Sequence, residues 1–169
     1  MQLLDLIIIY HSRTNGTWQM ATAAFDAAKL HSQNVKIYNA EKIDFSDDFE
    51  NDFLNAKSFI FACPENLATM SGEMKAFFDK FFYKAVDKIQ ARPYAVMICA
   101  GSDGENTARQ INRIVTAWKL KLVAEPLIIK TNSQTPEQIL SPKVISESDL
   151  QKCCEIAESL VLGVNMGIF

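Results

Sequence analysis

The stretch Leu3 to Thr17, LLDLIIIYHSRTNGT, joins a nearly continuous apolar run to a polar turn. The run from Leu3 to Tyr10 is typical of a strand that is buried on both faces. Polar residues and one glycine follow from His11 to Thr17, and an alanine-rich pattern of helical period runs from Thr17 to Leu30. The stretch therefore predicts a strand, a loop and a helix, which is the first unit of an α/β fold.

Four further apolar runs have the length of strands, and segments of helical period lie between them. The runs are Val35 to Tyr38, Ser58 to Cys63, Tyr94 to Ala100 and Leu122 to Ile129. Three later segments carry apolar stripes at helical spacing, formed by Met74, Phe77, Phe78, Phe81 and Phe82, by Ala108, Ile111, Val115 and Trp118, and by Leu150, Cys153, Cys154, Ala157, Leu160 and Val161. The alternation predicts right-handed crossovers and a parallel sheet with helices on both faces.

Two of the predicted strands suit the edges of this sheet. The run Val35 to Tyr38 is short and has polar flanks, and the last run contains Pro126, which cannot donate to a strand ladder. The other three runs suit central positions, so we expect a three-layer fold with a five-stranded parallel sheet of order 2-1-3-4-5. Residues Lys130 to Ile145 predict an extended surface connection. We expect one domain over residues 1–169.

Composition argues against several classes of protein. A net charge of -3 without a basic stripe is atypical of nucleic-acid binding, and no stretch approaches the ~20 apolar residues of a membrane span. The apolar N-terminal segment lacks the basic flank and cleavage site of a signal peptide, so we expect a cytoplasmic protein that binds no membrane. The four cysteines favour reduced thiols, and no Cys/His spacing predicts a metal site.

The loop after the first predicted strand has the composition of an anion site. The first amides of a helix have no intrahelical acceptors, and the helix dipole attracts negative charge. The candidate residues are Ser12, Arg13, Thr14, Asn15, Gly16 and Thr17. Plain capping of the helix by Thr14, Asn15 or Thr17 explains the loop equally well. The loop has neither the Walker pattern nor the G-x-G-x-x-G pattern, which disfavours triphosphates.

Two more polar loops are expected at the same edge of the sheet, where ligands of open α/β folds bind. The first follows the third predicted strand and contains Pro64, Glu65, Asn66, Leu67, Ala68, Thr69 and Met70. The second follows the fourth and contains Gly101, Ser102, Asp103 and Gly104. The two glycines let the backbone approach a planar ligand, and Ser102 or Asp103 can bond its polar edge. A turn followed by a helix cap is the alternative.

The first loop resembles the phosphate-binding loop of the flavodoxin superfamily, S/T-x-T-G-x-T. Ser12, Thr14 and Thr17 fall on its hydroxyl positions, although Asn15-Gly16 stands where the superfamily places glycine first. Residues 71–79, SGEMKAFFD, are similar to flavodoxin-type quinone reductases. The start Pro64-Glu65 with the later S-G-x-M-K resembles the NAD(P)H-dependent FMN reductases, and the resemblance spans most of residues 3 to 118. It implies FMN as cofactor and NAD(P)H as electron donor, with residues 64–70 along the isoalloxazine edge.

Together with the three loops, the resemblance implies an FMN-binding oxidoreductase that passes electrons from NAD(P)H through the flavin to a quinone or other small acceptor. The flavin performs such chemistry itself, so no catalytic side chain is assigned. Two alternatives remain open: a flavodoxin-type electron carrier that docks protein partners, and a flavin-free binding module of the same fold. The resemblance also implies a possible homodimer.

Overall fold

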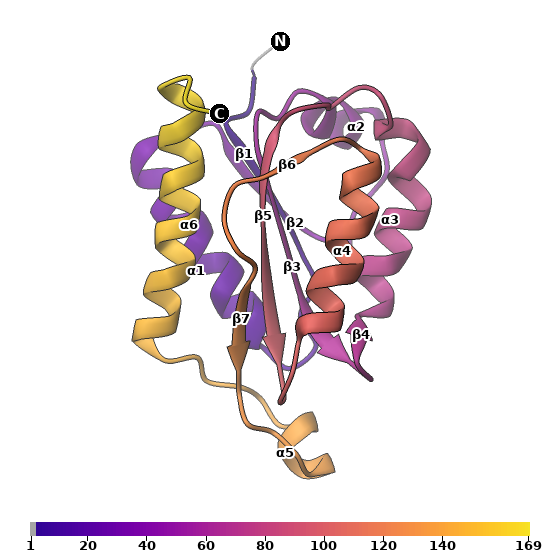
Figure 1. The fold of residues 1–169 in the computed structure, drawn as a ribbon, viewed down its shortest axis with the longest axis vertical. Coiled ribbons are helices and arrows are strands. Elements are labelled where there is room, and N and C mark those ends of the chain that lie inside the picture. Colours follow the sequence, from indigo (N-terminus) through magenta and orange to yellow (C-terminus); the bar gives the residue numbers. More distant parts are fainter. Residues whose placement is uncertain (1–2) are drawn as a thin grey trace.

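The computed structural model describes residues 3–169, so the first two residues of the apolar N-terminal segment lie outside it. It forms three layers, with one sheet between two groups of helices (Figure 1). The strands are β1 (Leu6–Tyr10), β2 (Val35–Asn39), β3 (Phe59–Asn66), β4 (Thr69–Met70), β5 (Pro93–Ala100), β6 (Lys121–Leu122) and β7 (Leu127–Lys130). The helices are α1 (Gly16–His31), α2 (Asp47–Leu54), α3 (Gly72–Ala85), α4 (Glu105–Ala117), α5 (Pro136–Leu140) and α6 (Glu147–Asn165).

The sheet confirms the predicted topology. Its parallel strands lie in the order β2-β1-β3-β5-β6, which is the order 2-1-3-4-5 when the strands of the main sheet are counted along the chain. Strand β1 pairs with β2 on one side and with β3 on the other. The carboxyl ends of β1, β3 and β5 therefore lie next to one another, and the loops that follow them meet at one edge.

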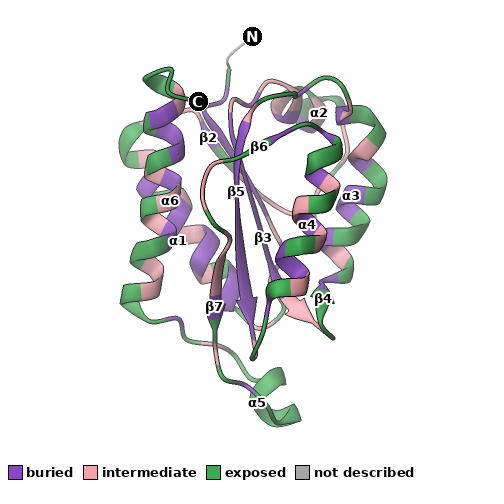
Figure 2. Cartoon of the chain, in the orientation of Figure 1, coloured by how far each residue is buried: buried purple, intermediate pink, exposed green. Residues whose placement is uncertain are grey.

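Alternate residues of the central strands enter two separate hydrophobic cores. Ile7, Ile9, Phe59 and Phe61 face α2, α3 and α4, where Trp118 is fully buried. Leu6, Ile8, Ile60 and Met97 face α1 and α6, whose alanines allow these helices to pack closely on the sheet. Figure 2 shows the central strands buried along their length between the two helical layers. Because helices cover both faces of the sheet, successive residues of a central strand are all buried, which explains the near-continuous apolar runs in the sequence.

The last predicted strand, Leu122 to Ile129, is not continuous. The structure divides it into β6 and β7, which both pair with β5 and are separated by residues 123–126. Pro126 lies in this break because it has no N–H to donate. The sequence predicted a single run that contains Pro126, and the structure divides this run into two short strands, while its place at the sheet edge is confirmed.

Three local elements also differ from the prediction. Strand β3 continues to Asn66 and forms a short antiparallel hairpin with β4, so residues 64–70 are not an irregular loop. Helix α2 buries Phe49 and Phe53, one turn apart, and was not predicted. Helix α5 interrupts the connection that was expected to be extended, with Thr135 forming a capping box and Pro136 in its first turn. No helix within residues 3–169 combines the length and apolarity needed to cross a membrane.

Candidate functional site

The three predicted loops meet around a cavity of about 260 Å³ at the carboxyl edge of the sheet. The first loop leads into α1, the second is the β3–β4 hairpin, and the third joins β5 to α4. A fourth segment, which follows β7 and contains α5, closes the remaining side. The lining residues are Arg13, Thr14, Thr17, Pro64, Glu65, Asn66, Leu67, Cys99, Ala100, Gly101, Ser102, Thr131, Ser133, Ile139 and Lys143.

The first loop owes its shape to the order Asn15-Gly16. Asn15 has a left-handed backbone (φ 69°), which asparagine tolerates better than most residues, so it takes the conformation that a glycine usually adopts. A side chain at Gly16 would place its Cβ 2.5 Å from the Sγ atom of Cys99. The exchange of the two residues relative to the superfamily motif therefore leaves the loop able to turn into α1.

One side chain of this loop bonds to the first turn of the helix, and a buried hydroxyl stays without a partner in the described chain. Asn15 makes no side-chain capping bond, although the Ser12 hydroxyl accepts a hydrogen bond from the Trp18 N–H at 3.1 Å. Thr17 is 1% exposed, and its Oγ1 has no hydrogen-bond partner among residues 3–169. A buried hydroxyl without a partner costs free energy, and such groups in native proteins call for an explanation. Because Thr17 lines the cavity, a ligand there can supply the missing partner.

Three polar contacts hold the hairpin against α4. The Gly104 N–H donates to Glu65 Oε2 at 2.8 Å, the Asn106 side-chain amide donates to the Ala68 carbonyl at 2.6 Å, and the Met70 N–H donates to Gln110 Oε1 at 3.0 Å. These bonds come from the second loop, the third loop and the body of α4. The two loops are therefore fixed relative to each other before any ligand binds.

The turn of the hairpin is strained. Leu67 and Ala68 both have left-handed backbones, with φ of 50° and 62°. Two-residue hairpin turns with positive φ favour asparagine and glycine, and a residue with a side chain pays a steric cost there. Leu67 is also 98% exposed and lies at the rim of the cavity. The turn thus presents an apolar side chain at the entrance in a conformation that the local sequence disfavours.

The third loop needs both of its glycines. Gly104 has φ of 91°, and a Cβ there would lie 2.6 Å from Ile128. A Cβ on Gly101 would lie 2.8 Å from the carbonyl oxygen of Ser133. The glycines therefore serve close packing against β7 and the segment after it, in addition to any approach to a ligand.

The predicted site residues fall into two groups. Those that line the cavity are Arg13, Thr14, Thr17, Pro64, Glu65, Asn66, Leu67, Gly101 and Ser102. The others do not line it: Asn15, Gly16, Ala68, Asp103 and Gly104 lie within the same loops, Ser12 lines an adjoining hollow, and Thr69 and Met70 line a groove on the side of α4. Sequence reasoning missed the wall formed by Thr131, Ser133, Ile139 and Lys143.

The adjoining hollow of about 390 Å³ shares Arg13 and Asn66 with the cavity. His11 lies in it, 5% exposed, with Nδ1 3.5 Å from the Glu73 carboxylate but without the geometry of a hydrogen bond. Burial lowers the pKa of His11 below its ordinary value, and the neighbouring Glu73 and Glu41 oppose this shift. His11 is therefore a mostly neutral imidazole near pH 7.

The cavity contains a thiol that is not a nucleophile at neutral pH. Burial raises the pKa of Cys99 to about 11, although the nearby Lys143 acts to lower it. Burial likewise raises the pKa of Cys63 to about 12. Reactivity of a cysteine requires the thiolate, so both side chains act as small apolar groups. Trp18, 45% exposed, does not line the cavity.

The sheet order and the loop-bounded cavity at its carboxyl edge define a flavodoxin-like α/β protein. The model of the family described as NADPH-dependent FMN reductase matches residues 11–133, and the chain belongs to this family. No curated protein matches the chain.

Solved structures with the same fold include a WrbA-like flavodoxin from Agrobacterium tumefaciens, with a TM-score of 0.74 and 16% identity over 95% of this chain and 97% of that one. The flavodiiron protein from Giardia intestinalis gives a TM-score of 0.78 with 14% identity over 97% of this chain and 37% of that one. A flavone reductase gives a TM-score of 0.71 with 14% identity over 95% of this chain and 62% of that one. Likeness at such identities establishes the fold.

The residues present fit a flavin mononucleotide. The Thr17 hydroxyl, which has no partner in the described part of the chain, lines the cavity together with Thr14 and Arg13. These residues offer hydroxyl donors and a positive charge to a phosphate. Pro64, Asn66 and Leu67 on one side and Gly101 and Ser102 on the other bound the part of the cavity where a planar ring can lie.

Proposed function

We propose that the chain binds FMN in the cavity between its three loops and transfers electrons from NAD(P)H to a quinone or another small acceptor. The observation that carries this proposal is the buried Thr17 hydroxyl, which has no hydrogen-bond partner within residues 3–169 and lines the cavity at the start of α1. A flavin phosphate supplies an acceptor for this group. Membership of the FMN reductase family supports the same assignment.

The first loop would hold the phosphate. The hydroxyls of Thr14 and Thr17 donate hydrogen bonds, the first amides of α1 point toward the loop, and Arg13 contributes positive charge. Gly16 lets the loop lie against Cys99, because any side chain there would collide with the thiol. These residues bind and orient the cofactor without entering the reaction.

The second and third loops would position the ring. Glu65 accepts the Gly104 N–H, and this bond keeps the two loops at a fixed separation. Because the separation of these loops is already fixed, less free energy is spent on ordering the site when a ligand binds. When bound, FMN supplies the redox chemistry, since its ring accepts electrons from a reduced nicotinamide and passes them on. The Cys99 thiol stays protonated at neutral pH and takes no part.

Absorption spectroscopy of the freshly purified protein, followed by FMN titration of the flavin-free protein, tests the proposal. We expect a visible flavin spectrum or saturable quenching of FMN fluorescence, and FMN-dependent oxidation of NADPH when a soluble benzoquinone is present. Absence of both FMN binding and NAD(P)H oxidation would overturn the proposal. Binding without NAD(P)H oxidation would instead point to an electron carrier.

A further inference from the structure

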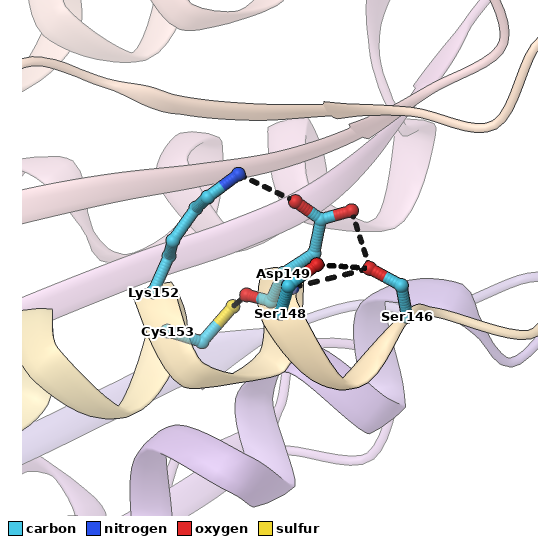
Figure 3. A network of polar contacts seen from close by, with 5 residues as sticks. All are labelled: Ser146, Ser148, Asp149, Lys152 and Cys153. Carbon is cyan, nitrogen blue, oxygen red and sulfur yellow. Dashed lines mark hydrogen bonds and ion pairs between the residues drawn. The ribbon is translucent and has the colours of Figure 1, made fainter.

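The segment from Thr131 to Ile145, which we call the strap, forms one wall of the cavity. It leaves the sheet where the Thr131 N–H donates to the Ala100 carbonyl at 2.8 Å. Figure 1 shows α5, the middle of the strap, projecting beyond the carboxyl ends of β5 and β7. Its far end leads into α6, where the Ser146 hydroxyl accepts a hydrogen bond from the Asp149 N–H and donates one to the Asp149 carboxylate. This carboxylate also pairs with Lys152 (Figure 3).

Lys143 joins the strap to the first loop. Its N–H donates to the Thr14 carbonyl at 2.8 Å, and its own carbonyl accepts the Gln19 side-chain amide at 2.7 Å. The same Gln19 amide reaches the Asn15 carbonyl at 3.0 Å. A Cβ on Gly16 would lie 3.3 Å from the Cβ of Lys143. The backbone of Lys143 is therefore packed directly on the loop that would hold a phosphate.

The ammonium group of Lys143 is held by backbone carbonyls. It donates to the carbonyl oxygens of Gln138, Ile139 and Ser141 at 2.6, 3.0 and 2.6 Å. These acceptors satisfy its hydrogen bonds but carry no net charge, so they do not neutralise it. The contacts also hold the ammonium in one place at the C-terminal end of α5.

The lining of the cavity is positive although the chain as a whole has a net charge of -3. Arg13 and Lys143 are the cations among the lining residues that the structure describes, and Glu65 is the carboxylate, with Oε2 bound to the Gly104 N–H. Arg13 is exposed, whereas Lys143 is half-buried and fixed by three hydrogen bonds. A charge held in one place acts more strongly on a bound ligand than a charge on a mobile side chain.

We propose that Lys143 is a specificity residue that makes the site prefer a phosphorylated flavin over an unphosphorylated one. Its charge acts on the ligand phosphate through the field at the first loop, while its direct hydrogen bonds remain with α5. The inference rests on the proposed FMN site and goes beyond it, because Lys143 lies outside the residues 11–133 that the family model matches.

The test compares the affinities of FMN and riboflavin for the flavin-free protein and three variants, measured by fluorescence titration. Lys143→Met removes the charge, Lys143→Arg keeps it, and Thr135→Ala weakens the cap of α5 without changing any charge. We expect Lys143→Met to lower FMN affinity about tenfold and riboflavin affinity less than about twofold, since the charge acts on the phosphate through its electric field and riboflavin carries no phosphate. The FMN effect of this substitution should shrink as salt is added.

The controls separate charge from strap order. Lys143→Arg and Thr135→Ala should keep the ratio of FMN to riboflavin affinity within about twofold of the wild-type value. The inference is wrong if Lys143→Met leaves this ratio unchanged, or if Thr135→Ala lowers it as much as Lys143→Met does. Failure of the wild-type protein to bind FMN overturns the proposed function and this inference with it, whereas FMN binding with an unchanged ratio overturns the inference alone.

Discussion

Replacing Thr17 by valine should make the flavin-free protein more stable and its FMN complex weaker. Valine keeps the branched shape of threonine and removes the hydroxyl, which is buried and has no partner among the described residues. A buried polar group without a hydrogen bond costs about 1–3 kcal/mol, and threonine and valine have similar helix propensities. The expected change in the free energy of unfolding is therefore an increase of about 1–2 kcal/mol.

The same substitution should lower FMN affinity at least about tenfold, because a hydrogen bond to a charged phosphate contributes about 1.5–3 kcal/mol. Urea denaturation without flavin measures the first effect, and fluorescence titration with FMN measures the second. The opposite signs of the two effects set this substitution apart from one that simply damages the fold.

Thr107 provides a matched control. Its hydroxyl is also buried and unpartnered among residues 3–169, but Thr107 lies on α4 and does not line the cavity. Thr107→Val should stabilise the protein by a similar amount and leave FMN affinity within about twofold. The reasoning is refuted if Thr17→Val destabilises the flavin-free protein, or if both valine variants bind FMN as the wild type does.

Three further substitutions test the geometry around the site. Gly16→Ala should lower the free energy of unfolding by about 1–3 kcal/mol in urea denaturation, because its Cβ would lie 2.5 Å from the Cys99 Sγ. Much of this loss should disappear when the substitution is made in a Cys99→Ala background, whereas equal losses in both backgrounds would contradict the contact. Glu65→Ala should cost about 1 kcal/mol and speed hydrogen exchange of the Gly104 amide, and unchanged exchange would show that this bond does not hold the loop. Because burial lowers the pKa of His11, the unfolded chain takes up a proton at this residue before the folded chain does, so stability declines as the pH falls below about 6.5, the ordinary pKa of histidine. His11→Gln should weaken this decline in urea denaturation measured at and below this pH. A slope as steep as that of the wild type would show that His11 does not cause it.

Much of the fold could be predicted because its signals are local and repeated. The stripe from Met74 to Phe82 predicted α3, and the apolar runs predicted the central strands, since a buried parallel strand has no polar face to interrupt it. Pro126 correctly marked the edge strand, although its missing N–H also broke that strand in two. Helix α2 was missed because two phenylalanines in eight residues give too short a pattern to recognise.

The site was predictable only where it follows the strand ends. The loops after β1, β3 and β5 could be placed at one edge by topology alone, and the structure brings them together. The hairpin at Leu67 and Ala68 carried no turn signal, because neither residue favours a positive φ. Lys143 and Ile139 were missed because they line the cavity only through the path of the strap. The strap and the first loop are more than a hundred residues apart in the sequence, and no local pattern indicates that they are neighbours in space.

Amide chemical-shift mapping by NMR, with FMN added to the flavin-free protein, tests the central claim most directly. Binding between the three loops predicts the largest shifts at the amides of Gly16, Thr17, Asn66, Gly101 and Ser102, which lie in those loops. It also predicts that the chemical shifts of amides at the opposite edge of the sheet remain unchanged. Shifts centred elsewhere, or no shifts at FMN concentrations that saturate related flavoproteins, would contradict the account.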